Sequence, residues 1–242
     1  MLTPVAQSSS ASVILRSRFR TVAEQRLYLF LLLQCCCQAA LMIERLGDVR
    51  IVFRVVTFAS SLSMLAFLPG TNPAPHPAGK VAGVVLGFMA LGLAHIECVM
   101  LSGISHWLLN ISIWAPLFWV GRIAISIRIL RNAMLLLWAF HVASSIVGVL
   151  QVYDPDRFAP SPEFVRKLLG TYAESLMITL SDGRRLWRPC GLSDSPGGAA
   201  TSGSFAVVVG MMLVMANVQW ILRATAVVGI ASGIFCIYIC EI

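Results

Sequence analysis

The sequence predicts an all-α fold: a polytopic helical membrane protein with about seven transmembrane helices and one long extracytoplasmic loop. Of its 242 residues, 58% are hydrophobic and only 12% are charged, whereas soluble domains average about 45–50% apolar and about 25% charged residues. This composition excludes an ordinary soluble globule, and the low charge excludes a disordered chain. The formal net charge is +7. Most basic residues flank apolar runs, a pattern that indicates membrane topology rather than nucleic-acid binding.

Seven apolar runs approach the length of about 20 residues that a helix needs to cross a bilayer. They are Leu27–Ile43, Ile51–Leu68, Ala82–Ile104, Leu108–Ile127, Asn132–Val152, Ser204–Ile221 and Ala224–Cys240. Because backbone polar groups in lipid must be satisfied internally, we expect each run to be a helix. The predicted organisation is a basic tail over residues 1–26, five helices over 27–152, a long loop over 153–202 and two further helices over 203–242.

The basic residues predict the orientation of these helices. The N-terminal tail is net basic, and the Arg122–Arg131 connection contains arginines without any acidic residue. The long loop instead contains acidic and basic residues in equal number. Because short cytoplasmic segments are enriched in Lys and Arg, this asymmetry predicts a cytoplasmic N-terminus and places the long loop outside.

The long loop contains local signals for three structures. Ser161-Pro162-Glu163 combines an N-cap residue with Pro at the first helical position, which predicts a short amphipathic helix on the membrane surface. Asp182-Gly183 separates two short runs and predicts a β-hairpin. The segment Arg188–Ala200 is rich in Gly, Ser and Pro, and it leads directly into the sixth helix.

The start of the sixth helix is a candidate phosphate site. A helix N-terminus presents free N–H groups and the positive end of the helix dipole, and Gly197 and Gly198 let a ligand approach the backbone closely. The preceding basic residues are Arg184, Arg185 and Arg188. This arrangement suits a membrane-bound phosphate or diphosphate. The alternative is a Gly/Pro turn whose arginines meet lipid headgroups or pair with Asp182 and Asp194.

Two segments resemble a known family. Gln151–Phe158, at the end of one span, and Arg188–Ala200, at the start of the next, are similar to the O-antigen ligase and polymerase superfamily. The variant in this chain looks closest to bacterial exopolysaccharide polymerases. Ala115–Val120 also fits such proteins, and the resemblance covers about residues 104–210.

The resemblance implies an inner-membrane glycosyltransferase that acts in surface polysaccharide biosynthesis. Members of this family transfer a glycan from undecaprenyl diphosphate to an acceptor sugar on the periplasmic side. The partners that it implies are the lipid-linked glycan, the acceptor sugar, the bilayer and proteins of polysaccharide assembly and export. The family acts without a metal, and the seven cysteines of this chain have no metal-ligand spacing. We therefore expect neither a metal nor a cofactor.

The resemblance also implies roles for individual residues. Arg188 is the arginine of the family motif, and with the start of the sixth helix it would stabilise charge that develops on the diphosphate. Glu174 or Asp194 would act as the base toward the acceptor hydroxyl. The resemblance also carries over Arg157 as a substrate-binding residue. From the local pattern we expect further substrate-binding residues, which are Arg184, Arg185, Gly197, Gly198, His106 and Trp187.

Two other interpretations stay open at this stage. Family members usually have about a dozen spans, so a chain with seven is either a truncated fragment or a subunit that does not catalyse alone. A transporter or exporter component is the second alternative. Its supporting features are His95 and Glu97, which fall inside the third predicted span, where ionisable side chains are usually functional.

Overall fold

The computed structural model describes residues 7–67, 76–95, 99–123, 126–170, 176–179, 183, 185–216 and 218–241. The chain divides into two compact units. The first unit comprises Met1–Leu33 and Arg54–Leu130, and the second comprises Gln34–Phe53 and Arg131–Ile242.

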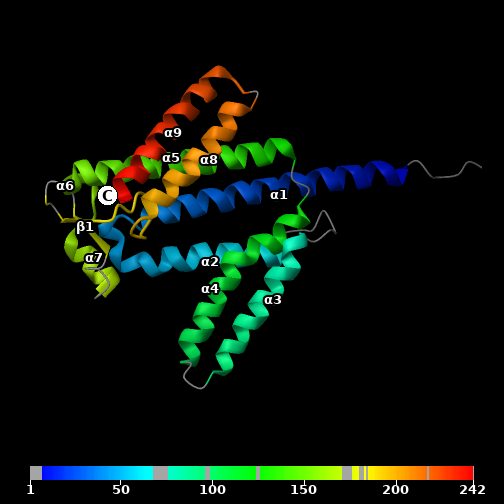
Figure 1. Cartoon of the computed structure of the whole chain (residues 1–242). Helices are drawn as coiled ribbons and strands as arrows, with labels where there is room; N and C mark the ends of the chain where they lie inside the picture. Colours follow the sequence, from blue (N-terminus) through cyan, green and yellow to red (C-terminus); the bar gives the residue numbers. More distant parts are fainter. Residues whose placement is uncertain are drawn as a thin grey trace, which may run out of the picture. The chain divides into compact units, whose positions relative to one another are not determined.

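Helices account for nearly all of the regular structure in the described part of the chain (Figure 1). The elements are α1 (Gln7–Ala40), the 3₁₀ helix η1 (Glu44–Val49), α2 (Arg50–Phe67), α3 (Pro77–Leu91), η2 (Gly92–Ala94), α4 (Met100–Trp119), η3 (Val120–Arg122), α5 (Ile127–Tyr153), α6 (Pro155–Phe158), α7 (Pro162–Leu169), β1 (Met177–Thr179), β2 (Arg185–Trp187), α8 (Gly198–Met215) and α9 (Trp220–Glu241).

Five helical segments among the described residues are long and apolar enough to cross a membrane. They are Glu44–Phe67, Pro77–Ala94, Ile127–Tyr153, Gly198–Met215 and Trp220–Cys240. The predicted all-α, membrane-type fold is therefore confirmed. A total of seven spans is not supported among the described residues, because α1 and α4, which contain most of the runs Leu27–Ile43 and Leu108–Ile127, are not among these five segments. Polar side chains lower the hydropathy of both helices, such as Gln34 and Gln38 in α1 and Asn110 in α4.

The predicted single helix over Ala82–Ile104 is wrong. Helix α3 ends at Leu91, η2 follows, and His95 has an extended backbone, with φ of −68° and ψ of 135°. Helix α4 begins at Met100 and continues through His106, which lies in the gap between the predicted helices Ala82–Ile104 and Leu108–Ile127. His95 therefore lies beyond the end of a helix rather than inside a span, and Glu97 lies outside the described residues.

The first unit is held together by an apolar cluster and by hydrogen bonds between helices. Ala115 and Trp119 of α4 pack with Met64 of α2, and the Trp119 ring meets Phe30 edge to face, with centroids 5.4 Å apart. The Ser61 hydroxyl donates to the Ser112 carbonyl over 2.7 Å. Such interhelical hydrogen bonds from Ser side chains are typical of packing between membrane helices.

The second unit is built around the α8–α9 hairpin (Figure 1). A Cβ atom on Gly203 would lie 2.8 Å from the Gly233 carbonyl oxygen, so only glycine permits this approach of the two backbones. Trp138 of α5 packs on the same hairpin, and its indole N–H donates to the Ala206 carbonyl over 3.1 Å. Small residues at helix crossings are the usual solution in membranes, where lipid offers no hydrophobic driving force.

The local signals in the long loop are confirmed where the structure describes them. Ser161 caps α7 by accepting a hydrogen bond from the Phe164 N–H. Strands β1 and β2 pair antiparallel around Gly183, and Ile178 lies opposite Leu186. Gly197 precedes α8 with a positive φ of 79°. The location of α7 on a membrane surface stays a prediction.

Candidate functional site

The segment between β2 and α8 is fixed to the end of α5 by one buried glutamine. The Gln151 side chain is 4% exposed. Its Oε1 accepts hydrogen bonds from the N–H groups of Cys190 and Gly191, both over 2.9 Å, and its Nε2 donates to the Gly191 carbonyl over 3.1 Å. These bonds satisfy backbone groups that burial would otherwise leave unpaired. Residues 189–198, which we call the docked loop, are thus anchored to α5 through side-chain contacts.

A second anchor lies two turns earlier on α5. The Ser144 hydroxyl accepts a hydrogen bond from the Leu192 N–H over 3.0 Å. Gly191 has a positive φ of 64°, and a Cβ atom there would lie 2.5 Å from Ser144 Oγ. Only glycine therefore combines this backbone conformation with this close approach to α5.

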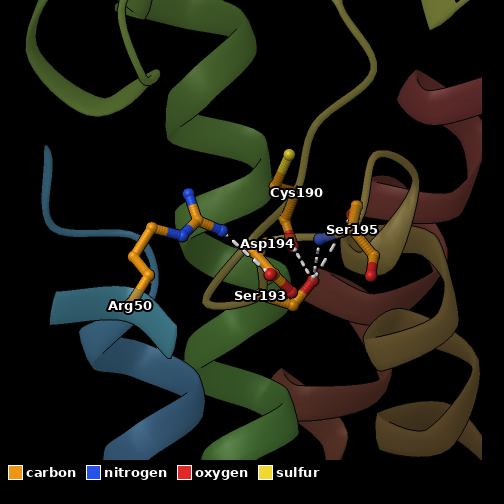
Figure 2. A network of polar contacts seen from close by, with 5 residues as sticks. All are labelled: Arg50, Cys190, Ser193, Asp194 and Ser195. Carbon is orange, nitrogen blue, oxygen red and sulfur yellow. Dashed lines mark hydrogen bonds and ion pairs between the residues drawn. The ribbon is translucent and has the colours of Figure 1, made fainter. Parts of the chain in front are cut away.

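The docked loop also forms a buried ion pair with the first residue of α2. Arg50 Nη2 lies 2.9 Å from Asp194 Oδ2, and the two side chains are 8% and 11% exposed. Figure 2 shows the guanidinium directed at the carboxylate. The Arg50 guanidinium carbon also lies 5.0 Å from the centroid of the Phe164 ring in α7, within cation–π distance. Arg50 thus joins the docked loop, α2 and α7.

Cys190 and Ser193 stabilise the inside of the docked loop. The Ser193 hydroxyl donates to the Cys190 carbonyl over 2.8 Å, and the Ser195 N–H donates to that hydroxyl (Figure 2). Burial, together with the nearby Asp194 and Cys240, raises the pKa of the Cys190 thiol to about 12, and the Arg50 guanidinium opposes this shift. Cys190 is therefore a protonated and unreactive thiol at neutral pH.

The expected cradle of N–H groups at the start of α8 is largely occupied by the docked loop itself. The N–H groups of Gly197 and Ala199 donate to the Pro189 carbonyl over 3.1 and 3.3 Å, and that of Gly198 donates to the Ser195 carbonyl over 2.9 Å. The glycine-lined helix start is present as predicted. Because these three N–H groups already have acceptors, an anion at the start of α8 would be stabilised by the helix dipole and not by hydrogen bonds from them.

A cleft of about 760 Å³ lies in the second unit, beside the end of α5. Three arginines line it from three different elements: Arg157 from α6, Arg166 from α7 and Arg185 from β2. Trp187 lines the same cleft, as do the apolar side chains of Met42, Phe158, Met177 and Leu186. The fold thus brings together three of the predicted binding residues, Arg157, Arg185 and Trp187.

The charge of the cleft favours an anion over a cation. Its described lining contains three arginines and two acids, Glu44 and Asp156. The Glu44 carboxylate accepts a hydrogen bond from the Ser161 N–H, which ties η1 to the start of α7. The Arg157 guanidinium carbon lies 5.5 Å from the Phe158 ring centroid, within cation–π distance, and both residues line the cleft. Arginine is also the side chain best suited to bind phosphate, because its planar guanidinium can donate two parallel hydrogen bonds to the phosphate oxygens.

The other predicted site residues are not gathered in this cleft. Arg188 is exposed and its N–H pairs with the Leu176 carbonyl over 3.0 Å, but it is not among the residues that line the cleft. His106 is exposed on α4 and belongs to the first unit. Glu174 and Arg184 lie outside the described residues. Among the residues that the structure describes, no group of His, Cys, Asp and Glu is arranged to hold a metal ion.

Three residues of the site were missed by sequence reasoning. Arg166 was counted only as part of a balanced loop, although it follows the Ser161 cap signal at a distance that places it in the same short helix. Gln151 is a polar side chain at the end of an apolar run, which is a usable signal. No local sequence signal pointed to Arg50, because its partner Asp194 is 144 residues away in the sequence.

No family model, no curated protein and no solved structure matches this chain.

Proposed function

We propose that this chain binds a lipid-linked diphosphate glycan in the arginine-lined cleft and takes part in transfer of that glycan to an acceptor sugar. The membrane would be the inner membrane of a bacterium, with a cytoplasmic N-terminus and the cleft on the periplasmic side. The function is that of a polysaccharide polymerase or O-antigen ligase, as the resemblance of Gln151–Phe158 and Arg188–Ala200 implies.

The observation that carries this proposal is the convergence of Arg157, Arg166 and Arg185 on one cleft at the end of an apolar helix. This cleft suits a ligand that is both anionic and membrane-bound. The guanidinium groups would bind the anionic group, and the neighbouring apolar helix α5 would lie beside the part of the ligand in the membrane. The apolar part of the lining suits the non-polar surface of such a ligand, and Trp187 is the aromatic side chain at the cleft.

The proposed chemistry has the diphosphate as the leaving group. The acceptor hydroxyl oxygen attacks the anomeric carbon of the glycan, the bond from that carbon to the diphosphate oxygen breaks, and the electron pair leaves with the diphosphate. Arg157, Arg166 and Arg185 would stabilise the charge that develops there, and Arg188, which follows Trp187 of the cleft lining in the sequence, would support them. Glu174 would accept the hydroxyl proton. Asp194 serves better as the positioning partner of Arg50, because its carboxylate is buried and ion-paired.

The experiment replaces Arg157 and Arg185 together by Ala in the full chain, in the cell that makes it. We expect lipid-linked diphosphate glycan to accumulate at least fivefold and surface polymer to fall, measured by mass spectrometry of lipid extracts. The matched control is Lys167→Ala, because Lys167 is an exposed basic residue of α7 outside the cleft lining. Unchanged lipid and polymer levels, with normal protein abundance, would contradict the proposal.

A further inference from the structure

A second cavity of about 420 Å³ lies in the second unit, among the last turns of α1, the middle of α5 and the first turns of α8. Its size is typical of a small-molecule site, for which about 300–1,000 Å³ is usual. Most of the residues that line it have polar side chains, beside an apolar surface. The side chains that the argument uses are those of Gln34, Gln38, His141, Ser144, Thr201 and Ser202.

The polar side chains of the lining carry no formal charge. None of the described residues around the cavity is Asp, Glu, Lys or Arg. The polar groups are instead amides, hydroxyls and one imidazole, each of which can donate and accept hydrogen bonds. Two of the three contributing helices, α5 and α8, are apolar enough to cross a membrane. Polar side chains in such helices are costly and are usually retained for a function.

His141 has a defined orientation in the cavity. Its Nδ1 lies 3.2 Å from Ser202 Oγ, and its ring packs against Phe205 with centroids 4.4 Å apart. When Nδ1–H donates to Ser202, the lone pair of Nε2 is available as an acceptor. Phe140 and Leu137 complete the lining with apolar surface. The cavity thus combines neutral donors and acceptors with one apolar side, which is the pattern that matches the hydroxyl and C–H groups of a sugar ring.

We propose that this cavity binds an uncharged sugar residue and excludes sugars that carry a carboxylate or phosphate. A buried anion needs a counter-charge, and the described lining contains no basic side chain. The N–H groups at the start of α8, where Gly198 lines the cavity, already donate to carbonyls of the docked loop. A carboxylated sugar would therefore lose hydration that these groups do not replace. This proposal rests on the proposed function, since the sugar would be part of the glycan that is transferred. The substrate class is then a neutral glycan.

One residue of the cleft lining is hydrogen-bonded to the docked loop, which lines the polar cavity. Gln151 lines the arginine-lined cleft and binds Cys190 and Gly191, while Ser193 and Ser195 of the same loop line the polar cavity. The loop that lines the polar cavity is therefore bonded to a residue of the arginine-lined cleft.

The test is saturation-transfer NMR on the full chain in zwitterionic lipid nanodiscs. The probes are glucose, galactose and N-acetylglucosamine, with glucuronate as the charged counterpart. We expect saturable binding of at least one neutral sugar and at least tenfold weaker binding of glucuronate. Gln38→Leu and Ser202→Ala should each weaken the neutral sugar at least fivefold. Ser204→Ala is the matched control, because its hydroxyl donates to the Ala200 carbonyl of its own helix and does not line the cavity.

Three results would overturn this proposal: no saturable binding of any neutral sugar, equal binding of glucuronate, or unchanged binding in both cavity variants. The Arg157→Ala, Arg185→Ala double variant separates it from the proposed function, because it should retain neutral-sugar binding and lose binding of undecaprenyl diphosphate. Diphosphate binding without any sugar binding would refute only the sugar cavity. Sugar binding without diphosphate binding would refute only the arginine-lined cleft.

Discussion

Replacing Arg50 by Met should lower the free energy of unfolding by about 3–5 kcal/mol, since this is the usual cost of leaving one partner of a buried ion pair alone. The variant leaves the Asp194 carboxylate, which is 11% exposed, without the guanidinium 2.9 Å away. It also removes the cation that lies over Phe164. Asp194→Leu should cost a similar amount, because it leaves the Arg50 guanidinium buried. Reversible unfolding of the purified full chain in mixed micelles gives both values.

Two further variants make this expectation specific to the ion pair. The double variant Arg50→Met, Asp194→Leu should recover at least half of the loss, because no uncompensated charge remains. Arg50 Nη1 has no hydrogen-bond partner among the described residues, so removing this nitrogen breaks no hydrogen bond. Asp48→Asn should leave unfolding unchanged, since the Asp48–Lys167 pair is exposed and 3.8 Å long. Additive single losses in the double variant would show that the pair does not exist.

Gln151→Leu should destabilise the chain by about 3 kcal/mol or more. The change keeps the side-chain volume but leaves two N–H groups and one carbonyl of the docked loop buried without a partner. Each such group costs about 1–3 kcal/mol. The docked loop should then detach from α5 before the helices unfold.

Alkylation of Cys190 reports this detachment directly. In the unchanged chain the thiol is buried, and its pKa of about 12 keeps it protonated, so N-ethylmaleimide at pH 7.5 should label it slowly. Gln151→Leu should raise the labelling rate at least tenfold, as measured by peptide mass spectrometry. Gln25→Leu, at an exposed position of α1, is the control and should leave the rate unchanged. Slow labelling in Gln151→Leu would mean that other contacts hold the docked loop.

Features coded by neighbouring residues could be predicted from the sequence. The Ser161 cap, the hairpin around Gly183 and the glycine start of α8 each depend on a few adjacent residues, whose backbone preferences persist in the fold. Arg185 was expected at a phosphate site from the local pattern, and Arg157 only through the resemblance. The structure supports their convergence because α6 and the hairpin face one cleft.

The break between α3 and α4 could not be predicted from hydropathy. Apolar residues continue on both sides of the break, so a count of apolar residues in a sliding window predicts one helix over Ala82–Ile104. Hydropathy measures affinity for lipid and does not locate the end of a helix. The local signals for the end of α3 are Gly92 and the ionisable His95, whose backbone is extended. The polar residues near His106 misled the prediction, because they lie on a continuous helix.

The anchors of the docked loop depend on contacts between distant segments. Arg50 and Asp194 are separated by 144 residues, and Gln151 reaches Gly191 across 40. No local pattern specifies such partners in a single sequence, because many arginines and acids are equally available. The same reason explains why Asp194 was predicted to act as a base, although its carboxylate is paired with Arg50.

Binding of undecaprenyl diphosphate to the full chain in nanodiscs tests the central claim most directly. Titration by native mass spectrometry should show saturable binding of undecaprenyl diphosphate and at least tenfold weaker binding of undecaprenol, because the arginines recognise the diphosphate. The Arg157→Ala, Arg185→Ala double variant should reduce the affinity for the diphosphate at least tenfold, and Lys167→Ala should not. Equal affinity for the two lipids, or an unchanged affinity in the double variant, would contradict the account.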